Sequence, residues 1–164
     1  PNTAKYCMKS ILTWITTKLP KRKSAGMNNN QTAYQLIGEI EGTRRLANAF
    51  YDIMETDPAL SALLAIHPLP LDSVREKFYL FLSGWLGGPD LFVQQYGHPR
   101  LRMRHLPFTV TPALKIQWMM CMDKAMQRTI DNQDLIQTLH NTFDGLAEHM
   151  INSPDPVCPS HKPS

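Results

Sequence analysis

The chain has 164 residues, of which 43% are apolar and 19% charged, so it can bury one core but is short for two full domains. No uninterrupted apolar run approaches the roughly 20 residues of a membrane span, which excludes a transmembrane protein. The three cysteines are odd in number and show no CxxC spacing. They therefore disfavour a disulfide framework, a zinc knuckle and a thioether-attached cofactor, and fit a reducing cytoplasm.

The formal charge of +3 is unevenly distributed along the chain. Residues 1–26 hold six basic side chains and no acid, whereas the remainder holds 11 basic and 14 acidic residues. The body is thus slightly acidic, and nucleic acid is not expected as a partner. For the basic extension, residues 1–30, composition favours disorder. The alternatives are a tail for a membrane surface or an anionic partner, a weak signal-like leader starting at Met8, or translated upstream sequence.

Residues 31–152 are expected to form the folded domain, and its first half shows three helical patterns. A long amphipathic helix is predicted after Gly42-Thr43, where apolar side chains recur at intervals of three and four residues. Asp57-Pro58 is a start signal for a short helix, which stops at residues 67–70. A second long helix follows, with the apolar stripe Leu71, Val74, Phe78, Phe81, Leu82 and Trp85. Gly87-Gly88-Pro89 ends it.

The second half begins with a stretch of little periodicity, residues 92–108, around clustered arginine and histidine. Irregular segments of this kind often carry function. Thr111-Pro112 caps a further helix, and apolar spacing from Leu135 to Met150 predicts the last one. Four prolines in residues 153–164 predict a loose tail. No segment alternates with a period of two, so the predicted fold class is all-α.

The residues that could carry chemistry are a histidine with its arginines and a few aromatic side chains. His105 follows Arg102 and Arg104, and one axial base with cationic groups at the rim is what a pocket for a dianionic cofactor needs. The plain alternative is a solvated basic face with a surface histidine. Tyr51 and Trp118 are either core aromatics or polar donors that face one pocket. An apolar wall is expected from two residues that share a helix face, Val74 and Phe78.

Two stretches resemble the group II truncated haemoglobins: FLSGWLGGP at residues 81–89 and GHPRLRMRHLPF at residues 97–108, closed by Trp118. The resemblance spans about residues 34–153 and implies a two-over-two helical fold that binds haem b without a covalent link. His105 would be the proximal iron ligand. The remaining roles that it implies are Tyr51 and Trp118 as distal hydrogen-bond donors, Val74 and Phe78 as the distal wall, and Phe92, Arg102 and Arg104 as contacts of the macrocycle and its propionates.

His67 stands where this family has a distal polar or aromatic residue. Three readings stay open: it donates a hydrogen bond to bound ligand, it coordinates iron as a sixth ligand, or it is a surface turn residue before Pro68. The chain also departs from the family pattern at Gly38-Glu39, where a pair of glycines is common. We therefore expect the first long helix to start somewhat differently.

The function that the resemblance implies is binding of dioxygen, nitric oxide and carbon monoxide, in the cytoplasm, with an unidentified reductase that keeps iron ferrous. Enzymatic turnover is left open as peroxidase, nitric oxide dioxygenase or peroxynitrite isomerase activity. The alternative is a haem-free helical interaction domain, in which His105 and its arginines form a basic partner-binding loop. The joint presence of Tyr51, His67, His105 and Trp118 in the family's order favours the globin.

Overall fold

The computed structural model describes residues 31–155, so the expectations for the basic extension (1–30) and for tail residues 156–164 lie outside the described residues. None of residues 31–155 forms a strand, which confirms the all-α class, and no helix among them is long and apolar enough to cross a membrane. The elements in chain order are α2 (Ala33–Leu36), α3 (Glu39–Thr56), the 3-10 turn η1 (Pro58–Leu60), α4 (Ser61–Ala65), α5 (Asp72–Trp85), α6 (Leu91–Tyr96), α7 (Leu101–His105), α8 (Pro112–Thr129) and α9 (Gln133–Met150).

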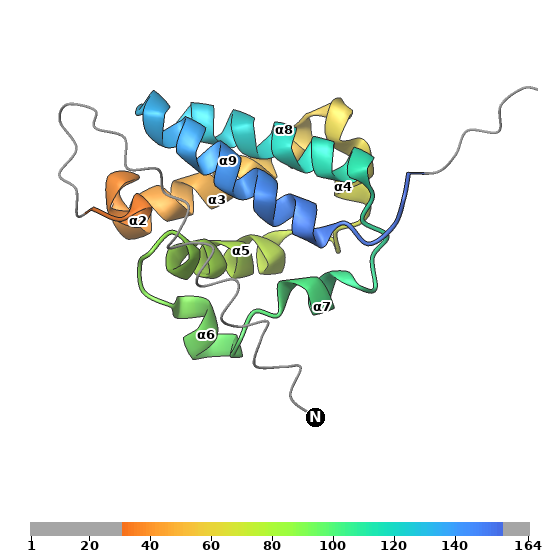
Figure 1. Ribbon diagram of the computed structural model, residues 1–164, viewed down its shortest axis with the longest axis horizontal. Helices are drawn as coiled ribbons and strands as arrows, with labels where there is room; N and C mark the ends of the chain where they lie inside the picture. The colour runs from red at the N-terminus through yellow and green to blue at the C-terminus, as the bar shows by residue number, and fades with distance from the viewer. Residues whose placement is uncertain (1–30, 156–164) are drawn as a thin grey trace, which may run out of the picture. The chain divides into compact units, whose positions relative to one another are not determined.

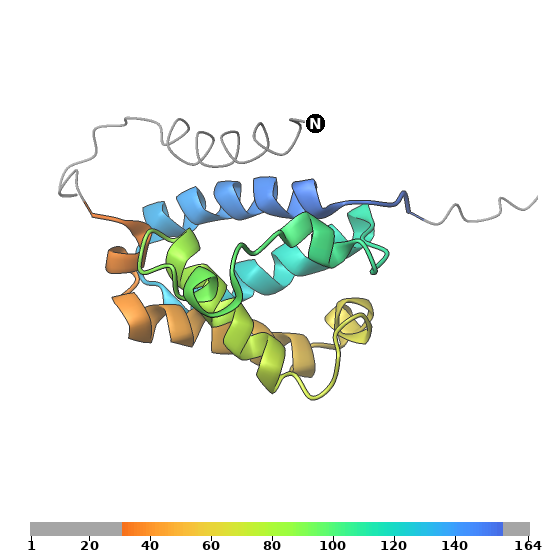
Figure 2. The ribbon, with the colours of Figure 1, turned by 90° about the horizontal axis from the view of Figure 1, so that it is seen from below.

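The four long helices form two pairs that pack on each other. α3 packs against both α5 and α8, and α8 packs also against α9 (Figures 1 and 2). This is the predicted two-over-two arrangement. The short helices lie at its margins, with α6 against α5, α7 against the end of α9, and α4 against α8. The two histidines of interest are thereby carried by short segments, His67 just after α4 and His105 at the end of α7.

The core lies between the long helices and is made of apolar side chains from all four. Each fully buried side chain of this size contributes about 1.5–3 kcal/mol through the hydrophobic effect. The largest of them, at most 1% exposed, are Leu46, Phe50, Met54, Leu82, Met122, Met126 and Phe143. Burial on this scale fixes the long helices, and with them the aromatic residues next to the core.

The first long helix starts earlier than predicted, at Glu39 rather than after Gly42-Thr43. Gly42 lies inside the helix because the chain passes close by: a Cβ there would lie 1.7 Å from the Ile37 carbonyl oxygen. Thr43 is accommodated inside the helix because its buried hydroxyl donates to the Glu39 carbonyl at 2.7 Å. Gly38 and Glu39 both have positive φ, 97° and 54°. A glycine pair suits this turn, and Glu39 adopts a backbone conformation that favours glycine.

Two further segments differ from the sequence expectations. The stretch 92–108 contains α6 and α7, which are six and five residues long, too short for a helical period to be detected. The tail is not loose at its start, because Asp155 Oδ1 accepts a hydrogen bond from the Ala113 amide at 3.0 Å, and Ser153 N donates to the Val110 carbonyl at 3.2 Å. The C-terminal end of the described chain is therefore attached to the start of α8.

Candidate functional site

An aromatic cluster joins α3, α5 and α8. Phe50 is its centre, with its ring centroid 5.2 Å from Tyr51, 5.0 Å from Phe78 and 5.5 Å from Trp118. The Tyr51 ring also meets Phe78 edge-on at 5.8 Å and His67 edge-on at 6.0 Å. The packing of α3 between α5 and α8 thus brings four predicted site residues, Tyr51, His67, Phe78 and Trp118, to one place.

Two polar donors in this cluster have no hydrogen-bond partner among the residues that the structure describes. Among residues 31–155, neither the Tyr51 hydroxyl nor the Trp118 indole N–H donates to another group, although Tyr51 is only 5% exposed. No side-chain polar atom of the described residues is both fully buried and unpaired. Both donors must therefore reach accessible space, which makes them available to a small ligand. Burial raises the pKa of Tyr51 well above its usual value, opposed by the nearby Arg75 guanidinium, so its hydroxyl stays protonated as a donor.

His67 is held by the helix that precedes it. Its Nδ1 lies 2.8 Å from the Leu63 carbonyl oxygen, four residues earlier, and a proton on Nδ1 makes that bond. The tautomer leaves Nε2 with a free lone pair. Burial lowers the pKa of His67; the bond to Leu63 opposes the shift, and the charge of His105 lowers the pKa further. The last effect indicates that the two imidazoles lie within electrostatic reach of each other.

His105 repeats this arrangement on α7. Its Nδ1 lies 2.7 Å from the Leu101 carbonyl oxygen, again four residues earlier, so Nε2 is left free as a ligand atom. The side-chain amide of Asn152, just after α9, donates to the His105 carbonyl at 3.2 Å. The apolar side chains Met103 and Leu106 are 60% and 61% exposed. Uncovered apolar surface beside an available imidazole suits a flat apolar ring more than bulk water.

The remaining predicted residues lie around α5, α6 and α7. Val74, one turn before Phe78 on α5, is partly buried against the core. Phe92 is buried on α6, and the Arg104 guanidinium carbon lies 5.5 Å from its ring centroid while Arg104 Nε donates to the Pro99 carbonyl at 2.8 Å. Arg102 reaches the other way and donates to the His149 carbonyl at the end of α9, at 2.7 Å. Among residues 31–155, Phe92, Arg102 and Arg104 make no ring contact or hydrogen bond with the aromatic donors Tyr51 and Trp118.

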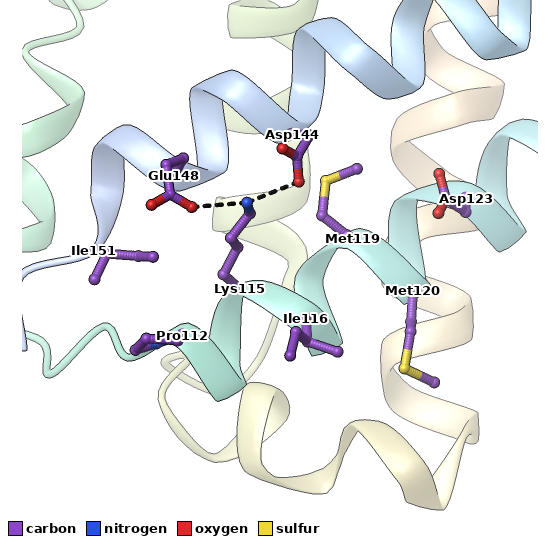
Figure 3. A pocket seen from close by; sticks show the side chains of 9 residues that line it. All are labelled: Pro112, Lys115, Ile116, Met119, Met120, Asp123, Asp144, Glu148 and Ile151. Carbon is purple, nitrogen blue, oxygen red and sulfur yellow. Dashed lines mark hydrogen bonds and ion pairs between the residues drawn. The ribbon is translucent and has the colours of Figure 1, made fainter. Parts of the chain in front are cut away.

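A groove of about 420 Å³ lies between α8 and α9 (Figure 3). Its apolar lining includes Ile116 and Met120, and on its α9 side Lys115 pairs with Asp144 at 2.8 Å. Ile116 and Met120 are each two residues from Trp118, which is about 200° around a helix. The groove therefore opens on the other face of α8 and does not belong to the aromatic cluster.

Comparisons with known proteins agree with this geometry. The family model described as bacterial-like globin matches residues 32–152. The group 2 truncated hemoglobin YjbI of Bacillus subtilis is 35% identical over 119 residues, which cover 73% of this chain and 87% of that protein. The chain belongs to the group II truncated haemoglobins.

Two solved structures are similar to this globin throughout their lengths. The cold-adapted truncated hemoglobin of Pseudoalteromonas haloplanktis is 51% identical, with a TM-score of 0.74 over 75% of this chain and 99% of that one. The group II 2-on-2 hemoglobin of Agrobacterium tumefaciens is 38% identical, with a TM-score of 0.73 over 79% of this chain and 100% of that one.

Membership of the family makes this chain a haem-based, oxygen-binding globin, and its residues fit that cofactor. The donor set offers an imidazole whose Nδ1 is already bonded, apolar aromatic rings, and two hydrogen-bond donors, Tyr51 and Trp118, that have no partner within the described part of the chain. Iron in haem takes nitrogen ligands of this kind.

Sequence reasoning missed three residues that shape the site. In the sequence, Phe50 is one of the apolar side chains that recur along the first long helix, and nothing in that pattern marks it as the ring that Tyr51, Phe78 and Trp118 share. Leu63 and Leu101 act through backbone carbonyls, which carry no side-chain signal. The spacing of four residues before each histidine, on a short helix, was the available clue.

Proposed function

We propose that His105 is the proximal ligand of haem b in this truncated haemoglobin. The observation that carries the proposal is the 2.7 Å bond between His105 Nδ1 and the Leu101 carbonyl oxygen. This bond fixes the tautomer in which Nε2 presents its lone pair, and it orients the ring along α7. When bound, ferrous haem would supply the site at which diatomic gases coordinate.

The distal side would be formed by Tyr51 and Trp118, which donate hydrogen bonds to a ligand held near the aromatic cluster. A hydrogen bond to a charged acceptor is worth about 1.5–3 kcal/mol, and it is strongest where water is excluded. Val74 and Phe78 would form the apolar wall beside these donors. The ligands proposed are dioxygen, nitric oxide and carbon monoxide. Two donors on one ligand slow its release, which argues against rapid oxygen delivery.

His67 lies next to one of these donors, because its ring meets the Tyr51 ring edge-on. We assign it a distal role as a reversible sixth ligand through Nε2; a hydrogen bond from this ring to bound ligand would require the proton on Nε2 and the loss of the bond to Leu63. Its lowered pKa keeps the ring neutral near pH 7, and a neutral ring is what coordination needs. On the rim, Phe92 would contact the macrocycle, and the charges of Arg102 and Arg104 would attract its propionates.

High affinity and slow release suit redox chemistry on nitric oxide, peroxynitrite or peroxide better than bulk transport. That role, with a cytoplasmic location and a reductase as partner, completes the proposal. A haem-free helical interaction domain is the competing function, and it predicts no haem uptake at all.

The test is an absorption spectrum of the purified chain with stoichiometric haem, recorded ferric and then dithionite-reduced under argon. The proposal predicts a shifted Soret band. Sharp, split bands in the green region of the reduced spectrum would identify six-coordinate iron with His67, and one broad band would identify an open site held by His105 alone. No Soret shift would reject haem binding and support the interaction domain.

A further inference from the structure

We propose that Gln117 is a positioning residue that sets the distal histidine, because it supplies the missing cap of the short helix that carries His67. The inference rests on the proposed distal role of His67. It concerns one side-chain contact between α8 and α4, made by the residue that directly precedes Trp118.

The helix α4 cannot hold its own position. It has five residues, and its N-cap residue, Leu60, makes no side-chain hydrogen bond to the free N–H groups of the first turn. A helix of this length is not stable by itself. The Leu63 N–H is one of those free donors, and Leu63 is only 2% exposed, so water does not compete well for it. It donates instead to Gln117 Oε1 at 2.9 Å, across 54 residues of sequence.

The same peptide backbone holds His67. The Leu63 carbonyl oxygen accepts from His67 Nδ1 at 2.8 Å. Leu63 thus has its N–H fixed by α8 and its carbonyl bonded to the histidine, so a shift of Leu63 moves the imidazole. Because Gln117 and Trp118 are neighbours on α8, one turn of this helix controls both the distal histidine and a distal donor.

Other contacts of the segment do not replace this bond. Asp57 pairs with Lys124 of α8, but it lies before η1, six residues ahead of Leu63. After His67, residues 68–70 are exposed, with Leu69 at 72%, and Leu71 returns to the core at 3% exposure. Among residues 31–155, the hydrogen bond that Gln117 accepts is therefore the last side-chain hydrogen bond before His67 on the N-terminal side, and the next anchor after His67 is the apolar side chain of Leu71.

The test compares three variants of the full chain, each loaded with haem and carbon monoxide so that the sample is diamagnetic. Gln117→Met keeps the length of the side chain and removes the acceptor, whereas Gln117→Glu keeps an acceptor oxygen. Gln127→Met makes the same chemical change at an exposed position of α8 and serves as the matched control. NMR records hydrogen exchange at the Leu63 amide and the ¹⁵N signals of the His67 ring, which report its tautomer.

We expect Gln117→Met to speed exchange at Leu63 by about tenfold and to weaken the Nδ1–H signal of His67, with the His105 ring unchanged. Gln117→Glu and Gln127→Met should resemble the parent chain. The rate of gas release should change in Gln117→Met, and this change should vanish when His67→Ala is added. Unchanged exchange at Leu63 in a haem-loaded Gln117→Met chain, or an equal change in Gln127→Met, would overturn this inference alone. A chain that takes up no haem overturns the proposed function and this inference with it.

Discussion

Removal of one distal donor should speed oxygen release by a predictable factor. Tyr51→Phe deletes only the hydroxyl, because the ring remains packed against Phe50 at 5.2 Å and Phe78 at 5.8 Å. Trp118→Phe deletes the indole N–H and keeps an aromatic ring next to Phe50 and Phe143, now 5.5 and 5.8 Å from Trp118. Each lost bond to a charged acceptor is worth about 1.5–3 kcal/mol. Since 1.4 kcal/mol is a factor of ten, each variant should release oxygen about tenfold to about 100-fold faster.

The assay is stopped-flow displacement of oxygen from the ferrous, haem-loaded chain. Trp85→Phe is the matched control, because Trp85 stacks on Phe143 at 4.4 Å and makes no ring contact with Tyr51 or His67. It should leave the rate unchanged. The double variant reports whether the two donors bind one ligand, since a shared acceptor makes their effects non-additive. If Trp118→Phe and Tyr51→Phe both release oxygen at the parent rate with normal haem uptake, the donor assignment is wrong.

Three further predictions concern the stability and reactivity of the fold. The hydrogen bond from Lys124, and then the Ala59 amide, lower the pKa of Asp57, so its stabilising contribution is present above about pH 4 and is lost as pH falls through the lowered value. In urea unfolding, the parent chain should have a higher free energy of unfolding than Asp57→Asn, and this difference should shrink as the pH falls towards 2.5. A difference that does not change with pH would contradict this. Glu39→Gly should be about 1 kcal/mol more stable than Glu39→Ala, the reverse of the usual helix order, because φ at residue 39 is 54°; thermal melts that rank alanine higher would refute the strain. Burial raises the pKa of the Cys121 thiol to about 12, so iodoacetamide at pH 8 should label it roughly a thousandfold more slowly than an ordinary thiol until urea is added, as peptide mapping by mass spectrometry can measure. Native-state labelling at the ordinary rate would show that the thiol is accessible.

The long helices could be predicted from the sequence because burial imposes a period on eighteen-residue segments such as α3 and α9. The short ones could not. α2 has four residues, and its only signal was the capping box between Thr32 and Gln35, whose side chains each bond the other's backbone amide. The start of α3 was mistaken because Gly42 looks like a break, whereas it is required by the close approach of the Ile37 carbonyl.

Side chains of the candidate site could be proposed from the sequence, whereas the backbone groups that position them could not. Tyr51, His67 and Trp118 are far apart in the sequence, and only the resemblance to known globins predicted that they share one site. In the structure, aromatic contacts place them in one cluster. The bond from Arg102 to the end of α9 depends on how α7 and α9 pack, which no local pattern encodes. The contact between Gln117 and Leu63 joins residues 54 positions apart and has no sequence signature.

The most direct test of the central claim replaces the proposed axial base. Ferrous, unligated samples of the parent chain, His105→Gly and His67→Ala are compared by resonance Raman spectroscopy in the region of the iron–histidine stretch. We expect His105→Gly to lose this band and to regain it when free imidazole is added, because the small molecule fills the space of the missing ring, while His67→Ala should keep the band. Retention of the iron–histidine band in His105→Gly without imidazole would contradict the assignment of His105 as the proximal ligand.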